Sequence, residues 1–327
     1  MPGKQGEVRR LCNHLRRLWP GWSVWAPLPF VLHASWAAAR GGFHWENAVV
    51  LVVVLTLFAV GPRTKRLLVG AYPLGLVGVL YDAMKLVEYV GVSPSTVHVC
   101  DLRDMERALF GVTVNGARGT LHDWFQAHAL PCLDALCAIP YATFIFVCGA
   151  CAIWLYARDY ARMVRFAWCF FALNVAGFVT YHVFPAAPPW YYHLYGCRVD
   201  LLAPASEGPN LARVDARLGL HYFAAMYGRA SDVFGAMPSL HVAYALIVVL
   251  EGWACMRNGW RGASIAFFVA MCFSAVYLDH HWVLDVIAGV IYCLLVVGAA
   301  RRITRLRPVQ GAPEAGAPGA QPNEGAP

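Results

Sequence analysis

The stretch DHHWVLDVIAGVIYCLLVVG, residues 279–298, joins a cluster of titratable side chains to an apolar run. With its flanking residues, this run approaches the roughly 20 residues that an α-helix needs to cross the hydrocarbon core of a bilayer. Polar groups are costly at that depth, so two histidines and two aspartates at the entrance to such a helix need partners or a function. The stretch therefore predicts a membrane helix whose first turn carries chemistry.

The rest of the chain has the composition of a membrane protein. Of its 327 residues, 59% are hydrophobic and only 14% are charged, which is far from the average soluble domain. The apolar runs are too numerous for a signal peptide, and the stretch up to Trp19 is basic and lacks an apolar core, so we expect no cleavable targeting segment. We predict an all-α polytopic membrane protein with about eight transmembrane helices, at residues 22–40, 46–61, 67–90, 131–156, 165–184, 237–256, 262–279 and 281–300.

The positions of lysine and arginine predict the orientation, because cytoplasmic loops retain cations. In the eight-helix prediction every basic cluster falls on one side, with both termini in the cytoplasm. The formal charge of +7 is spread over these short clusters rather than along one stripe, so we expect no nucleic-acid partner. The loops 91–130 and 185–236, and the stretch that opens at Asp279, then face the periplasm or exterior. The high content of alanine, glycine and arginine favours a bacterial inner membrane.

Four parts follow from this pattern. They are a basic cytoplasmic N-terminus (1–21), N-terminal transmembrane helices (22–90), a catalytic membrane domain (91–307) and a tail rich in proline, glycine and alanine (308–327) that we expect to be disordered.

The cysteines mostly predict packing rather than chemistry. Eight of the eleven fall inside apolar runs, where cysteine behaves as a small buried residue. Cys148 and Cys151 have the Cys-x-x-Cys spacing, but no second pair, histidine or carboxylate lies nearby in that run, so we expect no metal site there. Cys100 and Cys197 both fall in the loops placed outside, where a disulfide between them is one possibility.

His281 and Asp285 are four residues apart, so on a helix they share one face. A carboxylate bonded to one imidazole nitrogen fixes the tautomer and leaves the other nitrogen as a directed lone pair, which is how a histidine nucleophile is prepared. The alternative is structural: histidines that reach towards the lipid headgroups and an aspartate that caps the helix.

A second stretch, FGAMPSLHVAY (residues 234–244), opens the sixth predicted helix from the same outer side. Pro238 suits a helix start, Ser239 can bond either free backbone amides or a phosphate, and His241 falls in the first turn. Two histidines at the outer ends of two helices indicate one nucleophile and one general acid for a leaving oxygen.

The pair MPSLH and HHWVLDVIAG resembles the second and third signature motifs of the type 2 phosphatidic acid phosphatase superfamily, membrane enzymes that form a phosphohistidine without a metal. Together with FPAAPPWYYHLYG (184–196), the motifs are similar to the inositol phosphorylceramide synthase branch, which moves phosphoinositol from phosphatidylinositol to ceramide. The resemblance implies His281 as nucleophile, Asp285 as its orienting carboxylate, His241 as general acid and Ser239 as a phosphate contact. It implies a phospholipid donor, a lipid acceptor and no cofactor.

The chain departs from the superfamily pattern in its cations. It lacks the Lys-x6-Arg-Pro motif, and Ala275 stands where phosphatases carry an arginine six residues before the nucleophile. A phosphomonoester dianion needs more positive charge than a phosphodiester, so this loss favours a diester substrate. The alternative function is a phosphatase acting on lipid phosphates or isoprenyl diphosphates, and a transporter or lipid-binding scaffold is a third possibility.

Further substrate contacts are predicted from position alone. Arg229 is the closest cation to MPSLH, and His280 adjoins the nucleophile. Trp190 and Tyr191 could line the site or anchor the chain at the membrane surface. Other candidate cations, each with a solvated role as the alternative, are Lys85, Arg103, Arg107, Arg213 and Arg217. The oligomeric state stays open.

Overall fold

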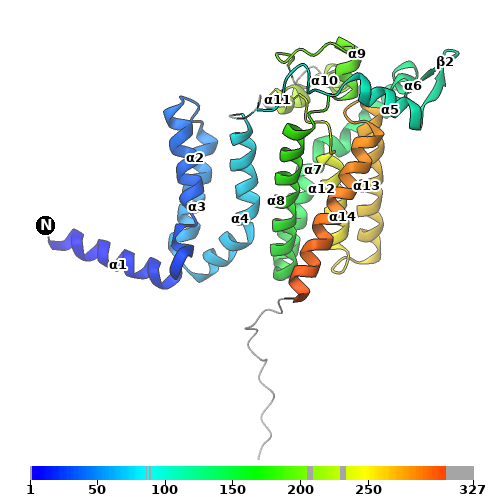
Figure 1. Ribbon diagram of the computed structural model, residues 1–327. Helices are drawn as coiled ribbons and strands as arrows, with labels where there is room; N and C mark the ends of the chain where they lie inside the picture. Colours follow the sequence, from blue (N-terminus) through cyan, green and yellow to red (C-terminus); the bar gives the residue numbers. More distant parts are fainter. Residues whose placement is uncertain (1, 86, 88–89, 205–208, 229–232, 307–327) are drawn as a thin grey trace, which may run out of the picture.

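Long apolar helices run side by side through the structure, and shorter helices cross one end of them (Figure 1). The computed structural model describes residues 2–85, 87, 90–204, 209–228 and 233–306, so Arg229 and the predicted tail 308–327 lie outside the described residues. The first half comprises α1 (Pro2–Leu18), a 3₁₀ turn (Gly21–Trp25), α2 (Leu28–Ala39), α3 (Trp45–Val60), α4 (Pro62–Met84), α5 (Cys100–Phe110), β1 (Val112–Val114), β2 (Ala117–Gly119) and α6 (Leu121–Ala127). The second half comprises α7 (Pro131–Arg158), α8 (Tyr160–Val183), α9 (Pro189–Tyr195), α10 (Pro209–Leu218), α11 (Tyr222–Tyr227), α12 (Leu240–Gly252), α13 (Asn258–Tyr277) and α14 (Val283–Leu306).

The mostly helical fold is confirmed, but the count of eight membrane helices is not. Among the described residues, five helices are long and apolar enough to cross a bilayer: α4, α7, α8, α13 and α14. The apolar helices α3 and α12 are shorter. The predicted first span, 22–40, shrinks to the 12 residues of α2, because Pro27 and a 3₁₀ turn precede its start. A two-stranded hairpin also departs from the all-α prediction.

Helix α12 lies at the centre of the C-terminal helical core and is packed by α7, α8, α13 and α14. Eleven of its 13 residues are buried. A helix surrounded by other helices does not have to match the thickness of the hydrocarbon core by itself. This explains why α12 can lie at the centre of the bundle although it is shorter than a typical membrane-spanning helix.

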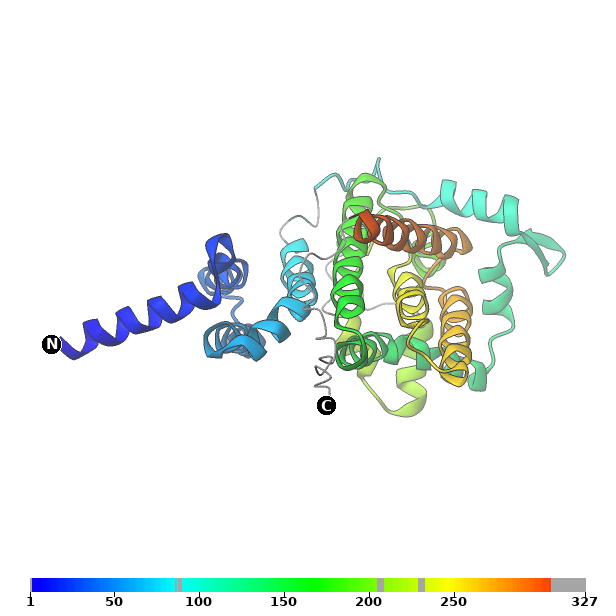
Figure 2. The ribbon, with the colours of Figure 1, turned by 90° about the horizontal axis from the view of Figure 1, so that it is seen from below.

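The N-terminal helices form a separate layer on one side of this core (Figures 1 and 2). Helix α4 packs against α8 and so joins the two parts, while α2 and α3 pack against α4. Trp19, which directly follows α1, stacks on Phe58 of α3, and its indole N–H donates to the Phe58 carbonyl at 2.8 Å.

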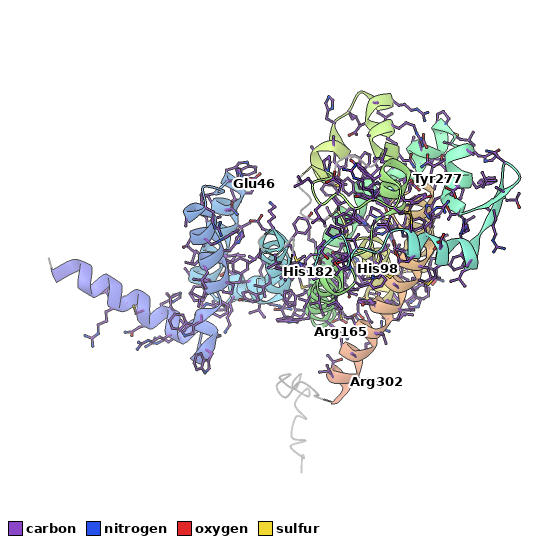
Figure 3. The ribbon with its side chains drawn as sticks, turned by 45° about the horizontal axis from the view of Figure 1, so that its top comes forward. Glu46, His98, Arg165, His182, Tyr277 and Arg302 are labelled. Carbon is purple, nitrogen blue, oxygen red and sulfur yellow. A yellow bond between two sulfur atoms is a disulfide. The ribbon has the colours of Figure 1, made fainter. Side chains whose placement is uncertain are left out.

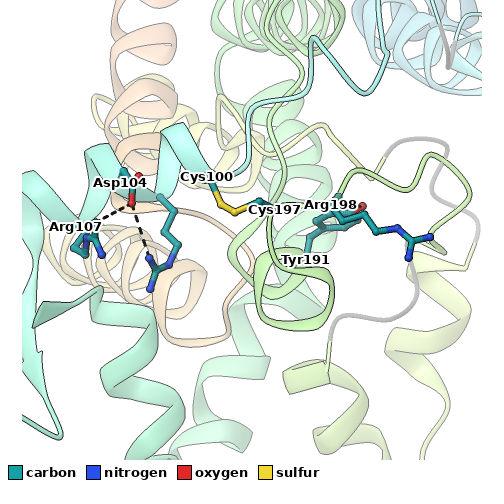
Figure 4. The surroundings of a disulfide bond; sticks show 7 residues. Cys100, Asp104, Arg107, Tyr191, Cys197 and Arg198 are labelled. Carbon is teal, nitrogen blue, oxygen red and sulfur yellow. Dashed lines mark hydrogen bonds and ion pairs between the residues drawn. A yellow bond between two sulfur atoms is a disulfide. The ribbon is translucent and has the colours of Figure 1, made fainter. Parts of the chain in front are cut away.

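The short elements form a cap over one end of the core, and we define the cap as α5, α6, α9, α10, α11 and the β1–β2 hairpin. The hairpin turns at Asn115 and Gly116, whose positive φ angles of 49° and 82° suit the tight turn that Asn-Gly favours. A disulfide joins Cys100, the first residue of α5, to Cys197, which follows α9 (Figure 4). The predicted possibility of this bridge is thus confirmed, and it ties the two predicted outer loops together.

At the opposite end of the core, a buried carboxylate is clamped by two arginines. Glu251 of α12 has no exposed surface and pairs with Arg165 of α8 at 2.6 Å and with Arg301 of α14 at 3.2 Å. Figure 3 labels Arg165 and Arg302 towards the end of the bundle that is remote from Tyr277. An unpaired carboxylate would be strongly destabilising in this low-dielectric interior, and the two arginines compensate the charge of Glu251.

The packing of α14 against the start of α12 depends on Gly289. A Cβ at this position would overlap the carbonyl oxygen of Ser239. We therefore predict that Gly289→Ala lowers the free energy of unfolding by about 1–3 kcal/mol, because the backbone atoms must move apart. Thermal unfolding of the detergent-solubilised chain measures this.

Gly298→Ala, on the same helix, is the matched control, because its Cβ would meet nothing within 4 Å. Equal unfolding temperatures for the two variants would show that the close approach of Gly289 to Ser239 does not contribute to the free energy of unfolding.

Candidate active site

Two histidines converge beneath the cap. His241 lies in the first turn of α12, His281 lies in the turn before α14, and His241 Nδ1 is 3.2 Å from His281 Nε2. The ring centroids are 5.4 Å apart. Residues that are 40 positions apart in the sequence therefore face one another at a single point, as the two quoted stretches predict.

The backbone holds the orientation of His281. Its Nδ1–H donates to the carbonyl oxygen of Ala236 at 2.8 Å, which leaves Nε2 as the lone pair that faces His241. Asp285 Oδ2 lies 3.6 Å from the same Nδ1, within ion-pair distance but beyond a hydrogen bond, and it accepts the backbone N–H of Trp282 at 2.9 Å. The predicted carboxylate is therefore beside His281, but the carbonyl of Ala236 makes the direct bond.

Ser239 bonds a free backbone amide at the start of α12, which is one of the two roles predicted for it. Its hydroxyl caps α12 by accepting the N–H of Val242 at 3.5 Å, and its own N–H donates to the Asp285 carbonyl at 3.0 Å. The side chain is fully buried and is not among those that line the cavity described below. Ser239 thus fixes the start of α12, and with it His241, rather than facing the open part of the site.

A cavity of about 600 Å³ extends from the two histidines between α4, α7, α8 and α12. Its walls are mostly aromatic and aliphatic, with contributions from Leu74, Phe144, Phe170, Phe178, Trp190 and Tyr244. A cavity of this size and lining suits an extended apolar group. The structure therefore places two facing imidazoles at one end of an apolar space.

His280 also lines the cavity, and its Nε2 has no hydrogen-bond partner among the described residues. Its ring lies between those of Tyr227 and Tyr141, at centroid distances of 5.2 and 5.3 Å. Burial, with the neighbouring His281, lowers the pKa of His280 to about 3. It is therefore a neutral group with an unused nitrogen at the site.

Trp190 and Tyr191, both predicted to contact the substrate, lie in different surroundings. Trp190 lines the cavity, whereas Tyr191 does not. Tyr191 is completely buried in the cap, where its hydroxyl donates to the Arg198 carbonyl and accepts the backbone N–H of Asp200 at 2.6 Å. Tyr191 therefore lies in the core of the cap and not at this cavity, and neither ring lies at an exposed surface as an anchor would.

The candidate cations have other partners. Arg213 and Arg217 both pair with the buried carboxylate of Asp134, and the remaining three pair with acids close in space: Lys85 with Asp82, Arg103 with Asp123 and Arg107 with Asp104. None of the described residues that line the cavity is lysine or arginine. Arg229 lies outside the described residues. Histidines are therefore the titratable bases that the described part of the chain presents to this space.

Residues 101–299 match the PAP2 superfamily. The chain belongs to the PAP2 superfamily. Over 260 residues it is 32% identical to the phosphoinositol dihydroceramide synthase of Bacteroides thetaiotaomicron, which covers 79% of this chain and 84% of that protein. Over 238 residues it is 30% identical to the inositol phosphorylceramide synthase catalytic subunit of Saccharomyces cerevisiae, covering 72% of this chain and 56% of that one. The corresponding synthase of Candida albicans is 28% identical over 252 residues, covering 76% and 50%.

The chain thus spans about half the length of these fungal relatives. No solved structure matches it. The resemblance to the superfamily that the two histidine motifs carry is confirmed.

Apart from His241 and His281, the cap contains a network of acids and histidines that the sequence motifs do not indicate. His193 of α9 lies between two carboxylates, with Nδ1 2.6 Å from Asp279 and Nε2 3.1 Å from Asp123 of α6. Burial alone would lower the pKa of His193, but its bonds to Asp123 and Asp279 outweigh burial and raise the pKa to about 9. Likewise, burial would raise the pKa of Asp279, yet the bonds from His122 and His193 lower it to about 2. His193 is therefore a cation held between anions at neutral pH.

This pairing predicts a loss of stability at alkaline pH. Because the folded pKa of His193 is raised from 6.5 to about 9, its contribution is complete below pH 6.5 and disappears as the pH rises through 9. We expect up to about 3 kcal/mol of the free energy of unfolding to be lost over this interval. The measurement is thermal unfolding of wild type and His193→Gln between pH 6 and pH 10.

The variant lacks the titrating cation, so its stability should change less over the same interval. Parallel curves for the two proteins would contradict the assignment.

Proposed function

We propose that this chain is a membrane phosphotransferase that moves phosphoinositol from phosphatidylinositol to the hydroxyl of a ceramide-like lipid. The observation that carries the proposal is the 3.2 Å approach of His241 Nδ1 to His281 Nε2 at the end of an apolar cavity of about 600 Å³. One imidazole can attack phosphorus while the other moves a proton, and the apolar space suits the chain of a lipid. The names of the relatives, synthases of inositol phosphorylceramide and of phosphoinositol dihydroceramide, agree with this chemistry.

In the first step, the lone pair of His281 Nε2 attacks the phosphorus of the donor. A P–N bond forms, the P–O bond to diacylglycerol breaks, and protonated His241 gives its proton to the departing oxygen. The Ala236 carbonyl keeps the other proton of His281 on Nδ1, 2.8 Å away. The carboxylate of Asp285, 3.6 Å from that nitrogen, stabilises the positive charge that the ring gains when Nε2 is phosphorylated.

In the second step, neutral His241 removes the proton from the acceptor hydroxyl. The hydroxyl oxygen attacks phosphorus, the P–N bond breaks, and His281 recovers its lone pair. Water is the competing acceptor, and the apolar walls favour a lipid alcohol over water at the reacting phosphorus. His280, neutral and with an unused Nε2, is suited to hydrogen bond a phosphate oxygen.

The phosphodiester preference rests on charge. Because the described residues that line the cavity include no lysine or arginine, they would compensate a phosphomonoester dianion less well than a monoanionic diester. This supports the transferase over a phosphatase of lipid monophosphates.

We further propose that the site faces the periplasm of a bacterial inner membrane. The basic side chains at the end of the helices opposite the cap include Arg165, Arg301 and Arg302, as expected for a cytoplasmic end. The cap carries the Cys100–Cys197 disulfide, which suits an oxidising compartment.

The direct test uses the purified full chain in vesicles that contain ceramide and phosphatidylinositol labelled in the inositol. We predict labelled inositol phosphorylceramide as the product and a fall of more than about 10³-fold in its rate for His281→Ala, because the nucleophile is lost. His128→Ala, which removes an exposed histidine of the cap, is the matched control and should retain the wild-type rate.

Free inositol phosphate as the main product would favour hydrolysis instead. Undiminished transfer by His281→Ala would remove His281 from the nucleophile's role.

A further inference from the structure

The residue that precedes the two adjacent histidines has an unusual backbone. Asp279 has a φ of 67°, in the left-handed region that few non-glycine residues adopt, at a cost of about 1–2 kcal/mol. This conformation turns the chain after α13, so that the backbone N–H groups of His280 and His281 both donate to the carbonyl of Ala275, at 3.1 and 3.0 Å. The direction in which His281 points therefore depends on a conformation that the chain does not adopt without support.

The support comes from the cap. The carboxylate of Asp279 is 1% exposed and accepts from His122 Nδ1 of α6 at 3.1 Å and from His193 Nδ1 of α9 at 2.6 Å. The carbonyl of Asp279 accepts the backbone N–H of Trp190 at 3.0 Å. Three groups from two separate cap helices thus hold one residue in place.

A third cap helix, α5, holds the other side of the turn. Glu106 of α5, fully buried, accepts the backbone N–H groups of Val283 and Leu284 at 3.0 and 3.3 Å, where α14 begins. Glu106 Oε1 is also 4.0 Å from His122 Nε2, so both ends of the turn connect to His122. The segment from Asp279 to Leu284, with His281 inside it, is therefore bracketed by cap side chains.

A second layer orients the imidazole of His193. Its Nε2 lies 3.1 Å from Asp123, and Asp123 accepts from Arg103 at 3.3 Å. Because His193 bonds a carboxylate through each nitrogen, its ring has one orientation that satisfies both bonds.

We propose that Asp279, His193 and His122 are positioning residues, which hold the turn that carries His281 so that its Nε2 faces the reacting phosphorus. None of the three is among the residues that line the cavity, so they act through the backbone of the turn and not on the lipid. Their effect on the rate rests on the proposed function, whereas their effect on the turn does not.

The test compares Asp279→Asn and His193→Gln in the full chain by two measurements. The first is steady-state transfer of labelled phosphoinositol, where kcat should fall about 10- to 100-fold and KM should change less than about 3-fold, because a small misplacement of the nucleophile slows the reaction without altering lipid binding. The kcat of Asp279→Ala should fall further than that of Asp279→Asn. Alanine cannot bond His122 or His193, and it adopts a left-handed backbone conformation less readily than asparagine does.

The second measurement is hydrogen exchange of residues 275–289 by mass spectrometry, which needs no activity. Both variants should exchange faster in this segment, and other core segments should keep the wild-type rate. Asp104→Asn is the matched control, because Asp104 is an exposed acid of α5 whose ion-pair partners among the described residues are arginines of its own helix. It should leave kcat and exchange unchanged.

Wild-type exchange in 275–289 with kcat lowered, or wild-type kcat with faster exchange, would overturn the positioning role. Faster exchange in the variants, with no turnover by the wild type on any phospholipid, would instead refute the proposed function and leave the support of the turn by the cap intact.

Discussion

The chemistry of this chain depends on backbone contact between the start of α12 and the start of α14. The N–H of Ser239 bonds the carbonyl of Asp285, and the carbonyl of Ala236 accepts the Nδ1–H of His281 at 2.8 Å. Only a glycine at position 289 allows the two segments to approach so closely. If they separated, His241 and His281 could no longer share one phosphorus, because each is carried by a different segment.

The two ends of the bundle serve different purposes. At one end, Glu251 ties α8, α12 and α14 together through arginines and so fixes the helices whose other ends carry the histidines. At the opposite end, the cap supplies little to the walls of the cavity but much to the turn at Asp279. The helical core therefore provides His241 and the apolar cavity, and we propose that the cap determines where His281 points.

The sequence was informative where a local pattern has a physical cause. Apolar runs located the long helices, and the two histidine motifs at the outer ends of predicted helices indicated that His241 and His281 lie close together. The short α2 was missed because a run of apolar residues does not reveal that a 3₁₀ turn and Pro27 delay the helix. The network around Asp279 was missed because its partners His193 and His122 are 86 and 157 residues away, with no spacing to mark them. Arg213 and Arg217 were candidates for phosphate because the sequence does not show that Asp134 pairs with both.

Covalent phosphorylation of His281 is tested by isolating the phosphorylated intermediate itself. The full chain is mixed with labelled phosphatidylinositol in the absence of an acceptor lipid, quenched in base, where phosphohistidine survives, and digested for mass spectrometry. We predict an inositol phosphate on Nε2 of His281 that disappears when ceramide is added before the quench. Label on a different residue, or transfer to ceramide with no covalent intermediate at any time, would contradict this prediction.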